Sequence, residues 1–559
     1  MMIPINSKIE QCDVLVMGGG MGGLMAAIAA ADGGAKVTVV EKADTRRSGS
    51  GTTGNDHFVC YIPEVHGTLD QFIRELRSTF AGKNCDLNIL RKFASRTFEV
   101  VKDWESWGIN MRINGTWTFE GHAFPGHMRT HLKYDGHEQK VILTKEAKKR
   151  GVRIINKTVI TEILMDGDQI AGALALDVSR DEPELRLFQC KALVTATGAA
   201  TRIYSAATPA LPFNVAGCPA CTGAGSAAMY RVGATLVNMD IPGIHAGPKY
   251  FTRAGKGTWI GVLRDSKGNN IGPFVDKPSR EHGDITSDVW PSVFRDKQAK
   301  GEGPIYMDCS ELSEEDMKYQ YWAFVCEGDT SLIDAMDKQG IDLRKHMVEF
   351  GSYECSLQGR GVQIDENAAT NIPGLYGAGD QVGNILCHVS GASVMGRIAG
   401  EQAAKFAEER KDWAPVEKNP TVLEKQAQYS AFMERDHGTS WKDMNFALNQ
   451  IMDDYGGGYK IRSEATLTAG IKYLTELKAM AEKRIKCNTA HELMRTLEVF
   501  DGLELGLLVC YSALERKETR GVHVRSDFPF TNPTMNDCFV TITKGPDGPV
   551  VAMRQARME

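Results

Sequence analysis

The chain has 559 residues, of which 42% are hydrophobic and 24% charged, the composition of a soluble globular protein long enough for two or three domains. Its net charge of -6 and the lack of a basic run argue against general nucleic-acid binding, and thirteen thinly spread cysteines favour a reducing cytoplasm over a secreted disulfide scaffold. Residues 1–12 carry no apolar signal core, and no run of about 18 apolar residues predicts a membrane span.

The first strong pattern is a glycine-rich turn between two expected strands. Val14–Val16 leads into a G-x-G-x-x-G turn, a small-residue helix follows, and the next strand, Val37–Val40, ends in Glu41. Glycines let the backbone approach a pyrophosphate at a helix N-terminus, and Glu41 is placed to accept hydrogen bonds from a ribose hydroxyl. This order of elements predicts a dinucleotide site. Its candidate glycines are Gly18, Gly20, Gly22 and Gly23.

A small, glycine-rich loop follows Glu41 and extends to Gly54. We expect its backbone amides to lie against the phosphate and the ring of the same ligand, because small residues allow a close approach. Lys42, Ser48 and Gly49 are therefore further cofactor-binding candidates.

Residues 87–107 alternate apolar and charged positions at helical spacing, which predicts a helix with Phe93, Val100 and Trp104 on one side. The segment 120–137 holds four histidines among glycines and prolines. Their spacing is not that of metal ligands, so a loop near a polar site is favoured and we predict no metal. These histidines are His122, His127, His131 and His137.

Nucleotide-fold patterning returns over residues 141–198. A predicted helix from Val141 to Arg150 precedes a hairpin-like pair of strands around Gly167. A buried strand then ends in a small-residue turn at Gly198, which we take as another cofactor-binding candidate. The nucleotide-binding sheet is thus interrupted and resumed, so its domain is discontinuous in sequence.

More polar, turn-rich sequence over residues 246–350 predicts a separate lid or capping domain, and helices dominate from residue 411 onward. The predicted fold class is α/β, with a discontinuous Rossmann-like domain, an inserted capping domain and a C-terminal helical domain. The expected bounds are 1–245 and 351–410 for the nucleotide-binding domain, 246–350 for the capping domain and 411–559 for the helical domain.

Four separated signatures follow one another in the order of a known family. They are the N-terminal glycine turn, Thr195–Gly198, Gly374–Asp380 and Arg516–Asp527. Together they resemble the flavoprotein subunits of the succinate dehydrogenase and fumarate reductase family, over nearly the whole chain. Within that family several stretches look most like the alpha subunit of adenylylsulfate reductase, namely Glu41–Ala43 with Arg47–Gly49, Gly303–Asp308, Gly340–Lys345 and Glu349–Glu354.

The resemblance implies that the discontinuous domain binds FAD. Asp380, at the end of a strand, can bind a ribityl hydroxyl. The helix near Ser393 can aim backbone N–H groups at the flavin edge where negative charge develops on reduction. In this family a histidine in the loop after Glu41 can hold the flavin covalently. Gly49 takes that position here, so we predict non-covalent FAD.

The resemblance separates the cofactor from the substrate chemistry. Fumarate reductases hold a dicarboxylate with histidines and arginines and deliver a proton from another arginine. The spacing Asp240–His245 is kept, so His245 matches one substrate histidine, but Asp288 stands where the proton-delivering arginine is expected. A second family histidine is missing around residues 356–361, and no Asn-Arg pair follows His388. Leaving substrate carboxylates unpaired costs on the order of several kcal/mol, so succinate and fumarate are disfavoured.

His388 follows the Gly-Asp motif closely, where adenylylsulfate reductases also carry a histidine near the flavin ring. We take His388 and His245 as catalytic candidates; a core histidine satisfied by the backbone is the alternative for each. Lys249, Arg253 and Arg264 could supply anion recognition, although a solvated surface position is the favoured interpretation of each.

Cys218 and Cys221 form a C-x-x-C pair directly before Thr222–Ser226, a loop near the flavin in this family. The pair could be a redox-active dithiol or half of a metal site, but no second close cysteine pair accompanies it and packing is the favoured interpretation. The segment Ile241–Pro248 has little aromatic content for stacking an adenine, which indicates a substrate altered from that of adenylylsulfate reductase.

These observations predict an FAD-dependent oxidoreductase, a flavoprotein subunit that exchanges electrons with a small anionic substrate. The resemblance implies that the other partner in this exchange is an iron–sulfur protein. No cysteine cluster has ferredoxin spacing, so the iron–sulfur centre would lie on another polypeptide. Two alternatives stay open. One is a fumarate reductase-like enoate reductase, which the missing arginine disfavours; the other is an electron-transfer flavoprotein subunit without a substrate of its own.

Overall fold

The computed structural model describes residues 2–78, 85–121, 123, 126–206, 213–215, 217–244, 246–249, 258–271, 277–281, 293–352, 356–385, 388–457 and 460–558. At its centre lies a parallel sheet of five strands in the order β17-β10-β2-β3-β6. The strands are short. They are mostly apolar because helices cover both faces of such a sheet. Their bounds are Val14–Met17 (β2), Val37–Val40 (β3), Arg153–Ile155 (β6), Ala192–Thr195 (β10) and Leu375–Gly377 (β17).

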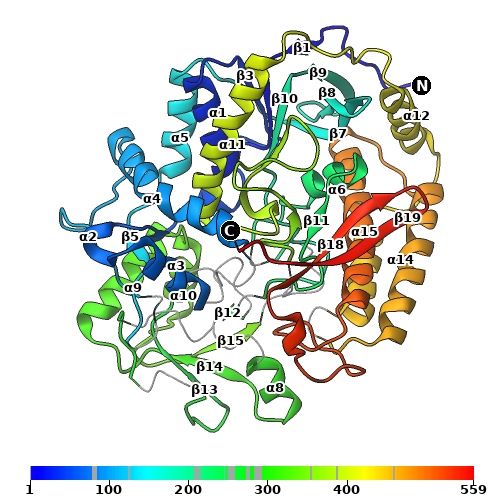
Figure 1. Ribbon diagram of the computed structural model, residues 1–559. Helices are drawn as coiled ribbons and strands as arrows, with labels where there is room; N and C mark the ends of the chain where they lie inside the picture. The colour runs from blue at the N-terminus through cyan, green and yellow to red at the C-terminus, as the bar shows by residue number, and fades with distance from the viewer. Residues whose placement is uncertain are drawn as a thin grey trace.

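Four helices of the nucleotide-binding part pack around this sheet and each other (Figure 1). Helix α4 buries Phe93, Val100 and Trp104, the apolar side that its sequence predicts. The bounds of the four are Met21–Asp32 (α1), Leu87–Trp107 (α4), Gln139–Lys149 (α5) and Val389–Glu409 (α11).

Helices α1 and α11 lie side by side, and their backbones touch (Figure 1). A Cβ atom on Gly396 would lie 2.3 Å from the carbonyl oxygen of Gly22, and one on Gly400 would lie 2.1 Å from that of Ala26. Both pairings advance by four residues in the same direction, so the two helices run parallel. Their N-termini, each with a partial positive charge, therefore lie at the same end of the sheet.

Two further sheets flank the nucleotide-binding sheet. The hairpin of β7 and β8 turns around Gly167, as the sequence predicts. One sheet has the order β1-β9-β8-β7, with bounds Glu10–Gln11 (β1), Thr158–Asp166 (β7), Gln169–Asp177 (β8) and Glu184–Gln189 (β9). The other is the two-stranded ribbon of His57–Val59 (β4) and His131–Lys133 (β5), with Pro63–His66 (α2) and Leu69–Ser78 (α3) after β4.

The segment around residues 246–352 has a sheet and an apolar core of its own. Trp259 packs on Phe324 and Phe350, with ring centroids 4.9 and 5.1 Å apart, inside a cluster separate from the main core. The domain bounds stated above stay a prediction. The elements are Ala246–Pro248 (β12), Val262–Arg264 (β13), Val293–Ala299 (α8), Ile305–Asp308 (β14), Glu314–Cys326 (α9), Thr330–Gln339 (α10) and Val348–Ser352 (β15).

The C-terminal part contains the expected helices and also a long hairpin, β18–β19, which the helical patterning does not predict. The hairpin joins two short strands into the sheet β16-β11-β18-β19. The strands are Leu236–Val237 (β11), Gly361–Val362 (β16), Cys538–Gly545 (β18) and Gly548–Gln555 (β19). The helices are Ala224–Arg231 (α6), which contacts them, and Pro420–Glu434 (α12), Trp441–Ile451 (α13), Glu464–Arg484 (α14) and Ala490–Glu515 (α15).

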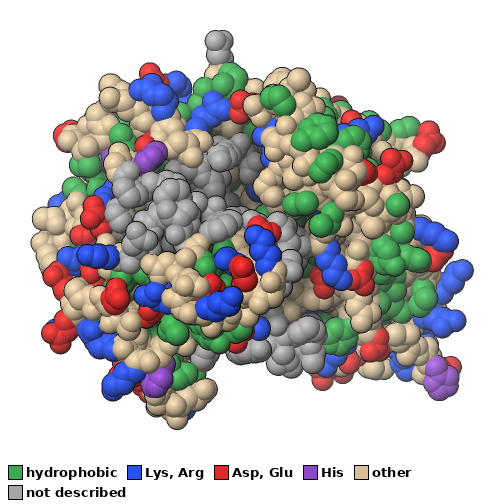
Figure 2. Space-filling view, turned by 90° about the horizontal axis from the view of Figure 1, so that it is seen from below, with side chains coloured by type: hydrophobic (Ala, Val, Ile, Leu, Met, Phe, Trp, Pro, Cys, Tyr) green, Lys and Arg blue, Asp and Glu red, His purple; other side chains and the backbone are tan. Residues whose placement is uncertain are grey.

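The surface seen in Figure 2 carries Lys and Arg side chains interspersed with Asp and Glu, and no broad basic area appears among the coloured side chains. Among the described residues, no helix is both long and apolar enough to cross a membrane.

Candidate active site

The glycine turn at the start of α1 has a shape that only glycine permits. Gly18 has φ +96°, and a Cβ there would lie 2.6 Å from the carbonyl oxygen of Ala196. A Cβ on Gly23 would lie 1.9 Å from the carbonyl oxygen of Gly18. At Gly20, by contrast, the nearest atom of the chain would be 3.6 Å away, so that glycine leaves room for a ligand rather than for the protein itself.

Glu41 stabilises the glycine turn through hydrogen bonds to its backbone. Its carboxylate accepts hydrogen bonds from the N–H of Gly19 at 2.7 Å and of Ala43 at 2.9 Å. The ammonium of Lys140, at the start of α5, donates to the carbonyl oxygen of Gly19. Burial lowers the pKa of Lys140 to about 8, and Glu41 opposes this shift. Glu41 therefore fixes the shape of the glycine turn, and its contact with a ribose stays a prediction.

Buried hydroxyl groups without partners mark the surface where FAD is expected. Among the described residues, five hydroxyl oxygens of this region are buried and make no hydrogen bond, and all lie in the loop after Glu41, beside Gly198 or in the first turn of α11. FAD, with its pyrophosphate, ribityl hydroxyls and polar ring edge, supplies the partners that such groups need. The five residues are Thr45, Ser48, Thr52, Thr222 and Ser390.

The other predicted flavin residues divide into those that present side chains and those that present backbone. Gly49 has φ +74° and open space around its Cα, which is room for a close ligand. Ser393 donates its hydroxyl to Val389 O at 2.6 Å, and as the fifth residue of α11 it lies beyond the free N–H groups of the first turn, so its predicted flavin contact stays a prediction. Lys42 forms an ion pair with the buried Glu498 at 2.7 Å. Gly198 adjoins the turn that carries Cys221.

His388 is the residue just before α11, and its backbone is unusual. Its φ is +123°, a backbone conformation that residues other than glycine rarely adopt. Where such residues do adopt it, they cluster at functional sites. Its N–H donates to Asp380 at 3.3 Å, and Asp380 also accepts from Gln358 at 3.3 Å. The residue predicted to bind the ribityl chain thus also fixes the predicted catalytic histidine.

Three histidine rings meet at this end of α11, and we call His57, His131 and His388 the histidine cluster. The ring centroid of His57 lies 5.4 Å from that of His131 and 6.4 Å from that of His388. Burial, reinforced by the neighbouring rings, holds the pKa of His131 well below its usual value, so this imidazole is neutral near pH 7.

A buried ion pair supports the histidine cluster from the ribbon β4–β5. Asp56 accepts hydrogen bonds from Lys133 Nζ at 2.8 Å and Thr258 Oγ1 at 3.1 Å, and it contacts His57 Nδ1 at 2.5 Å. Lys133 and Asp56 are 1% and 0% exposed. Because Thr258 precedes β13, the segment predicted as a cap closes on the FAD-binding part at this point. Burial lowers the pKa of Lys133, but Asp56 and Tyr319 together outweigh it and raise this pKa, which keeps the ammonium charged.

Asp56, His57 and Glu327 bring ligand atoms within 4.8 Å of one another, an arrangement that could hold a metal ion. The Lys133 ammonium already balances the charge of Asp56. Glu327 accepts a hydrogen bond from the Thr258 N–H at 2.6 Å. Donors of the chain thus already engage both carboxylates, which disfavours a metal ion at Asp56, His57 and Glu327.

The remaining predicted site residues lie apart from the histidine cluster or outside the described residues. His245, Arg253 and Asp288 are outside the described residues. Lys249 pairs with Glu349, and Arg264 pairs with Asp308. These two side chains are thus engaged in ion pairs within the capping segment.

The three described histidines of residues 120–137 lie in different surroundings. His131 joins the histidine cluster, whereas His127 and His137 pair with Glu75 and Asp135 near the surface. His122 is outside the described residues.

Sequence reasoning missed His57, Asp56 and Lys133. A signal was present, because His131-Leu132-Lys133 alternates as a strand does and so places His131 and Lys133 on one face.

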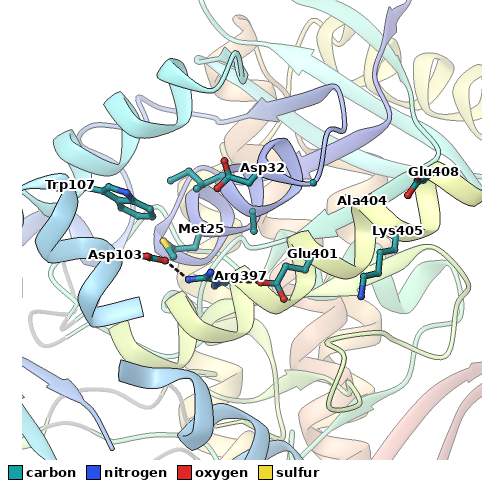
Figure 3. A pocket seen from close by; sticks show the side chains of 12 residues that line it. Met25, Asp32, Asp103, Trp107, Arg397, Glu401, Ala404, Lys405 and Glu408 are labelled. Carbon is teal, nitrogen blue, oxygen red and sulfur yellow. Dashed lines mark hydrogen bonds and ion pairs between the residues drawn. The ribbon is translucent and has the colours of Figure 1, made fainter. Parts of the chain in front are cut away.

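A surface hollow of about 350 Å³ lies elsewhere, against the later turns of α1 and α11 and the end of α4 (Figure 3). Arg397 reaches Asp103 and Glu401 across it, as the dashed lines of Figure 3 mark. The glycine turn and His388 are at the opposite ends of the same two helices. The hollow is therefore separate from the histidine cluster.

The sequence matches the family described as "FAD binding domain" over residues 13–394 and the family described as "Fumarate reductase flavoprotein C-term" over residues 446–559. A relative from Methanothermobacter marburgensis, described as a fumarate reductase (CoM/CoB) subunit, is 24% identical and is aligned over 95% of this chain and 96% of its own length.

Two solved structures share the fold. Adenylylsulfate reductase from Archaeoglobus fulgidus has a TM-score of 0.85 at 23% identity and covers 100% of this chain and 97% of its own. Quinol fumarate reductase from E. coli has a TM-score of 0.81 at 20% identity, with 99% and 98% covered. At these identities the likeness shows the fold of the chain.

Proposed function

The chain belongs to the FAD-binding-domain family and is an FAD-dependent oxidoreductase, and on that premise we propose that it exchanges two electrons with a small anionic substrate held by the histidine cluster. The observation that carries the proposal is the meeting of His57, His131 and His388 at the N-terminus of α11, beside the residues suited to FAD. When bound, FAD supplies the two-electron chemistry.

Anion recognition follows from the groups gathered there. The positive end of α11 faces the histidine cluster, and the neutral imidazole of His131 is an N–H donor. A small anion with several acceptor oxygens supplies what these donors lack.

Proton movement is assigned to His57 and His388. The contact of His57 Nδ1 with Asp56 fixes the orientation of the ring, as a carboxylate does for a catalytic histidine. Lys133 and Thr258 hold Asp56 in turn, so this arrangement is anchored by both the FAD-binding part and the capping segment. His388 approaches from α11, and these two histidines are the proposed acid and base.

FAD is proposed to be held without a covalent bond, because Gly49 offers no side chain to attach it. The test is denaturation of the purified protein followed by filtration. The yellow colour should pass the membrane with the small molecules. Flavin retained on the polypeptide would contradict this part of the proposal.

The electron partner is proposed to be an iron–sulfur protein, as the resemblance to the fumarate reductase and adenylylsulfate reductase flavoproteins implies. The thirteen cysteines of this chain show no ferredoxin spacing, so the iron–sulfur centre is placed on a separate polypeptide. Expression of the chain with its neighbouring reading frames, followed by affinity purification and iron analysis, tests this. Iron that copurifies in a fixed ratio to FAD supports the proposal, and a flavoprotein without iron under these conditions contradicts it.

The substrate class is tested by reoxidation of the anaerobically reduced protein. We expect oxidised sulfur anions to restore the flavin absorbance rapidly and enoates to do so slowly. His388→Gln and His57→Gln should each lower that rate by about 10²-fold or more, the usual contribution of an acid or base. His137→Gln, at an exposed histidine paired with Asp135, is the matched control and should change nothing.

A fumarate reductase-like enoate reductase is the second candidate, favoured by the match of residues 446–559 to the fumarate reductase flavoprotein C-terminal family. Rapid reoxidation by enoates alone would establish it over the first proposal. Silence with both panels would support the third possibility, a flavoprotein subunit that transfers electrons without a substrate of its own.

A further inference from the structure

Cys218 and Cys221 are the two ends of a tight turn. The N–H of Cys221 donates to the carbonyl oxygen of Cys218 at 2.9 Å, with Pro219 at the second position, where its fixed φ suits a β-turn. The ends of such a turn have Cα atoms within about 7 Å of each other, close to the separation that a disulfide spans. Both side chains are thiols, and they are hydrogen-bonded to one another.

Thr201 holds this turn at both ends. Its N–H donates to the carbonyl oxygen of Cys221 at 2.9 Å, and its hydroxyl oxygen lies 2.9 Å from the carbonyl oxygens of both cysteines. The cysteines are 8% and 7% exposed. The pair is therefore fixed where an S–S bond can form and break with little movement of the backbone.

The turn lies among three segments suited to FAD. A Cβ on Gly198 would lie 2.9 Å from Cys221 Sγ. The N–H of Cys218 donates to Ser50 Oγ at 3.5 Å, in the loop after Glu41. Asp380 and Lys140 are both close enough to Cys221 for charge interactions. The pair thus contacts Gly198 and the loop after Glu41, and it lies within the range of charge interaction of Asp380, the predicted ribityl residue, and of Lys140.

We propose that Cys218 and Cys221 are a redox-active dithiol that exchanges two electrons with bound FAD. In the oxidising direction two S–H bonds break and one S–S bond forms, and two electrons and two protons pass to oxidised FAD, leaving a disulfide and reduced FAD. The reverse direction restores both thiols. This proposal rests on the FAD of the proposed function but not on its substrate.

Two neighbouring groups fit this role. The hydrogen bond with Cys218, together with burial, raises the pKa of Cys221, so this side chain stays a protonated thiol near neutral pH. Lys140 interacts with both thiols and, with a pKa of about 8, can take up and return a proton near neutral pH.

The other cysteines provide matched controls. Cys12 and Cys190 are also close neighbours and fully buried, but they lie at the start of β2 and β10, away from the FAD loops. Cys538, at the start of β18, is the one described cysteine that is not fully buried. Cys190 or Cys538 can therefore be replaced without altering the proposed dithiol.

The test is a reductive titration of the FAD-bound protein under anaerobic conditions, after treatment with a thiol oxidant and desalting. The wild-type protein should take up two electrons per FAD for the flavin and two more for the disulfide. Cys218→Ser and Cys221→Ser should each need half as many, whereas Cys190→Ala and Cys538→Ser should match wild type. A wild-type protein that needs only two electrons per FAD would overturn the proposal.

A second measurement needs no variant and does not depend on activity. The oxidised and the fully reduced proteins are denatured with an alkylating agent, and peptides are weighed. Cys218 and Cys221 should be joined before reduction and alkylated after it; alkylation of both in the oxidised sample would overturn the proposal. Absence of FAD from the purified protein would contradict the proposed function itself, whereas bound FAD with two unchanging thiols would contradict only the dithiol.

Discussion

The carboxylate of Asp380 accepts a hydrogen bond from the backbone N–H of His388 across 3.3 Å. One residue thereby joins the cofactor site to the proposed acid–base site, because Asp380 is the candidate for the ribityl chain and His388 begins α11. The contact also holds His388 at φ +123°. Cofactor binding and histidine position can nevertheless be separated, since the contact uses the backbone of His388 and not its ring.

Asp380→Ala should weaken FAD binding, while His388→Gln should leave it near wild type. A hydrogen bond to a charged group contributes about 1.5–3 kcal/mol, which corresponds to about 10- to 100-fold in affinity. The measurement is FAD titration of the stripped protein by flavin fluorescence. Equal loss of affinity in both variants would show that the ring of His388 contributes as much as Asp380, and would contradict the separation of cofactor binding from the histidine side chain.

Removing one partner of the buried pair Asp56–Lys133 should destabilise the protein strongly, whereas replacing both partners with uncharged residues should destabilise it much less. Asp56→Asn leaves the Lys133 ammonium buried without its partner, so the free energy of unfolding should fall by about 3–5 kcal/mol, and Asp56→Asn with Lys133→Met should recover much of that loss. Urea unfolding measures both. Glu105→Gln is the control, because its pair with Arg112 is 36% and 38% exposed and should contribute at most about 1 kcal/mol. A double variant as unstable as Asp56→Asn would contradict this account.

His523 should make the protein sensitive to acid. Its Nδ1 accepts from Arg462 at 2.6 Å and its Nε2–H donates to Arg516 O at 3.0 Å, which fixes a neutral ring. Burial, then the charge of Arg462, lowers its pKa from 6.5 to about 3, although Asp240 opposes the shift. Below pH 6.5 the unfolded chain gains a proton that the folded chain refuses. Stability is therefore lost as pH falls from 6.5 towards about 3.

The comparison that isolates this effect is between wild type and His523→Gln, followed as urea midpoint against pH. The variant should lose less stability than wild type over that window. Asp501 acts in the opposite sense, since burial raises its pKa from 3.8 to about 6 and stability is lost as pH rises between those values. Because Asp501 is present in both proteins, its contribution cancels in the difference. Parallel curves would contradict the role of His523.

The flavin-binding part could be predicted from sequence because its pieces are local. The glycine spacing from Gly18 to Gly23 predicts the turn, the apolar run before Glu41 predicts the strand, and Gly167 predicts the turn of the β7–β8 hairpin. The histidine cluster is not local. His57, His131 and His388 come from three distant segments, and only the pairing of β4 with β5 and the position of α11 bring them together.

The C-terminal hairpin was missed for a related reason. Strands β18 and β19 are only half buried, and β18 owes its place to pairing with β11, about 300 residues earlier in the chain. Local patterning cannot reveal such a partner.

Gly20 and Gly23 should respond differently to alanine, which separates folding from FAD binding within one turn. A Cβ on Gly23 would lie 1.9 Å from the backbone oxygen of Gly18, so Gly23→Ala forces the turn apart and should destabilise the protein whether or not FAD is present.

Gly20 has φ -69° and no atom of the chain within 3.6 Å of such a Cβ. Gly20→Ala should therefore unfold in urea within about 1 kcal/mol of wild type. Its FAD affinity should nevertheless fall at least about tenfold, because the new methyl group occupies the space through which the pyrophosphate approaches the start of α1. FAD titration and urea unfolding of the stripped proteins measure both quantities. Wild-type affinity in Gly20→Ala would mean that the pyrophosphate does not lie over this turn.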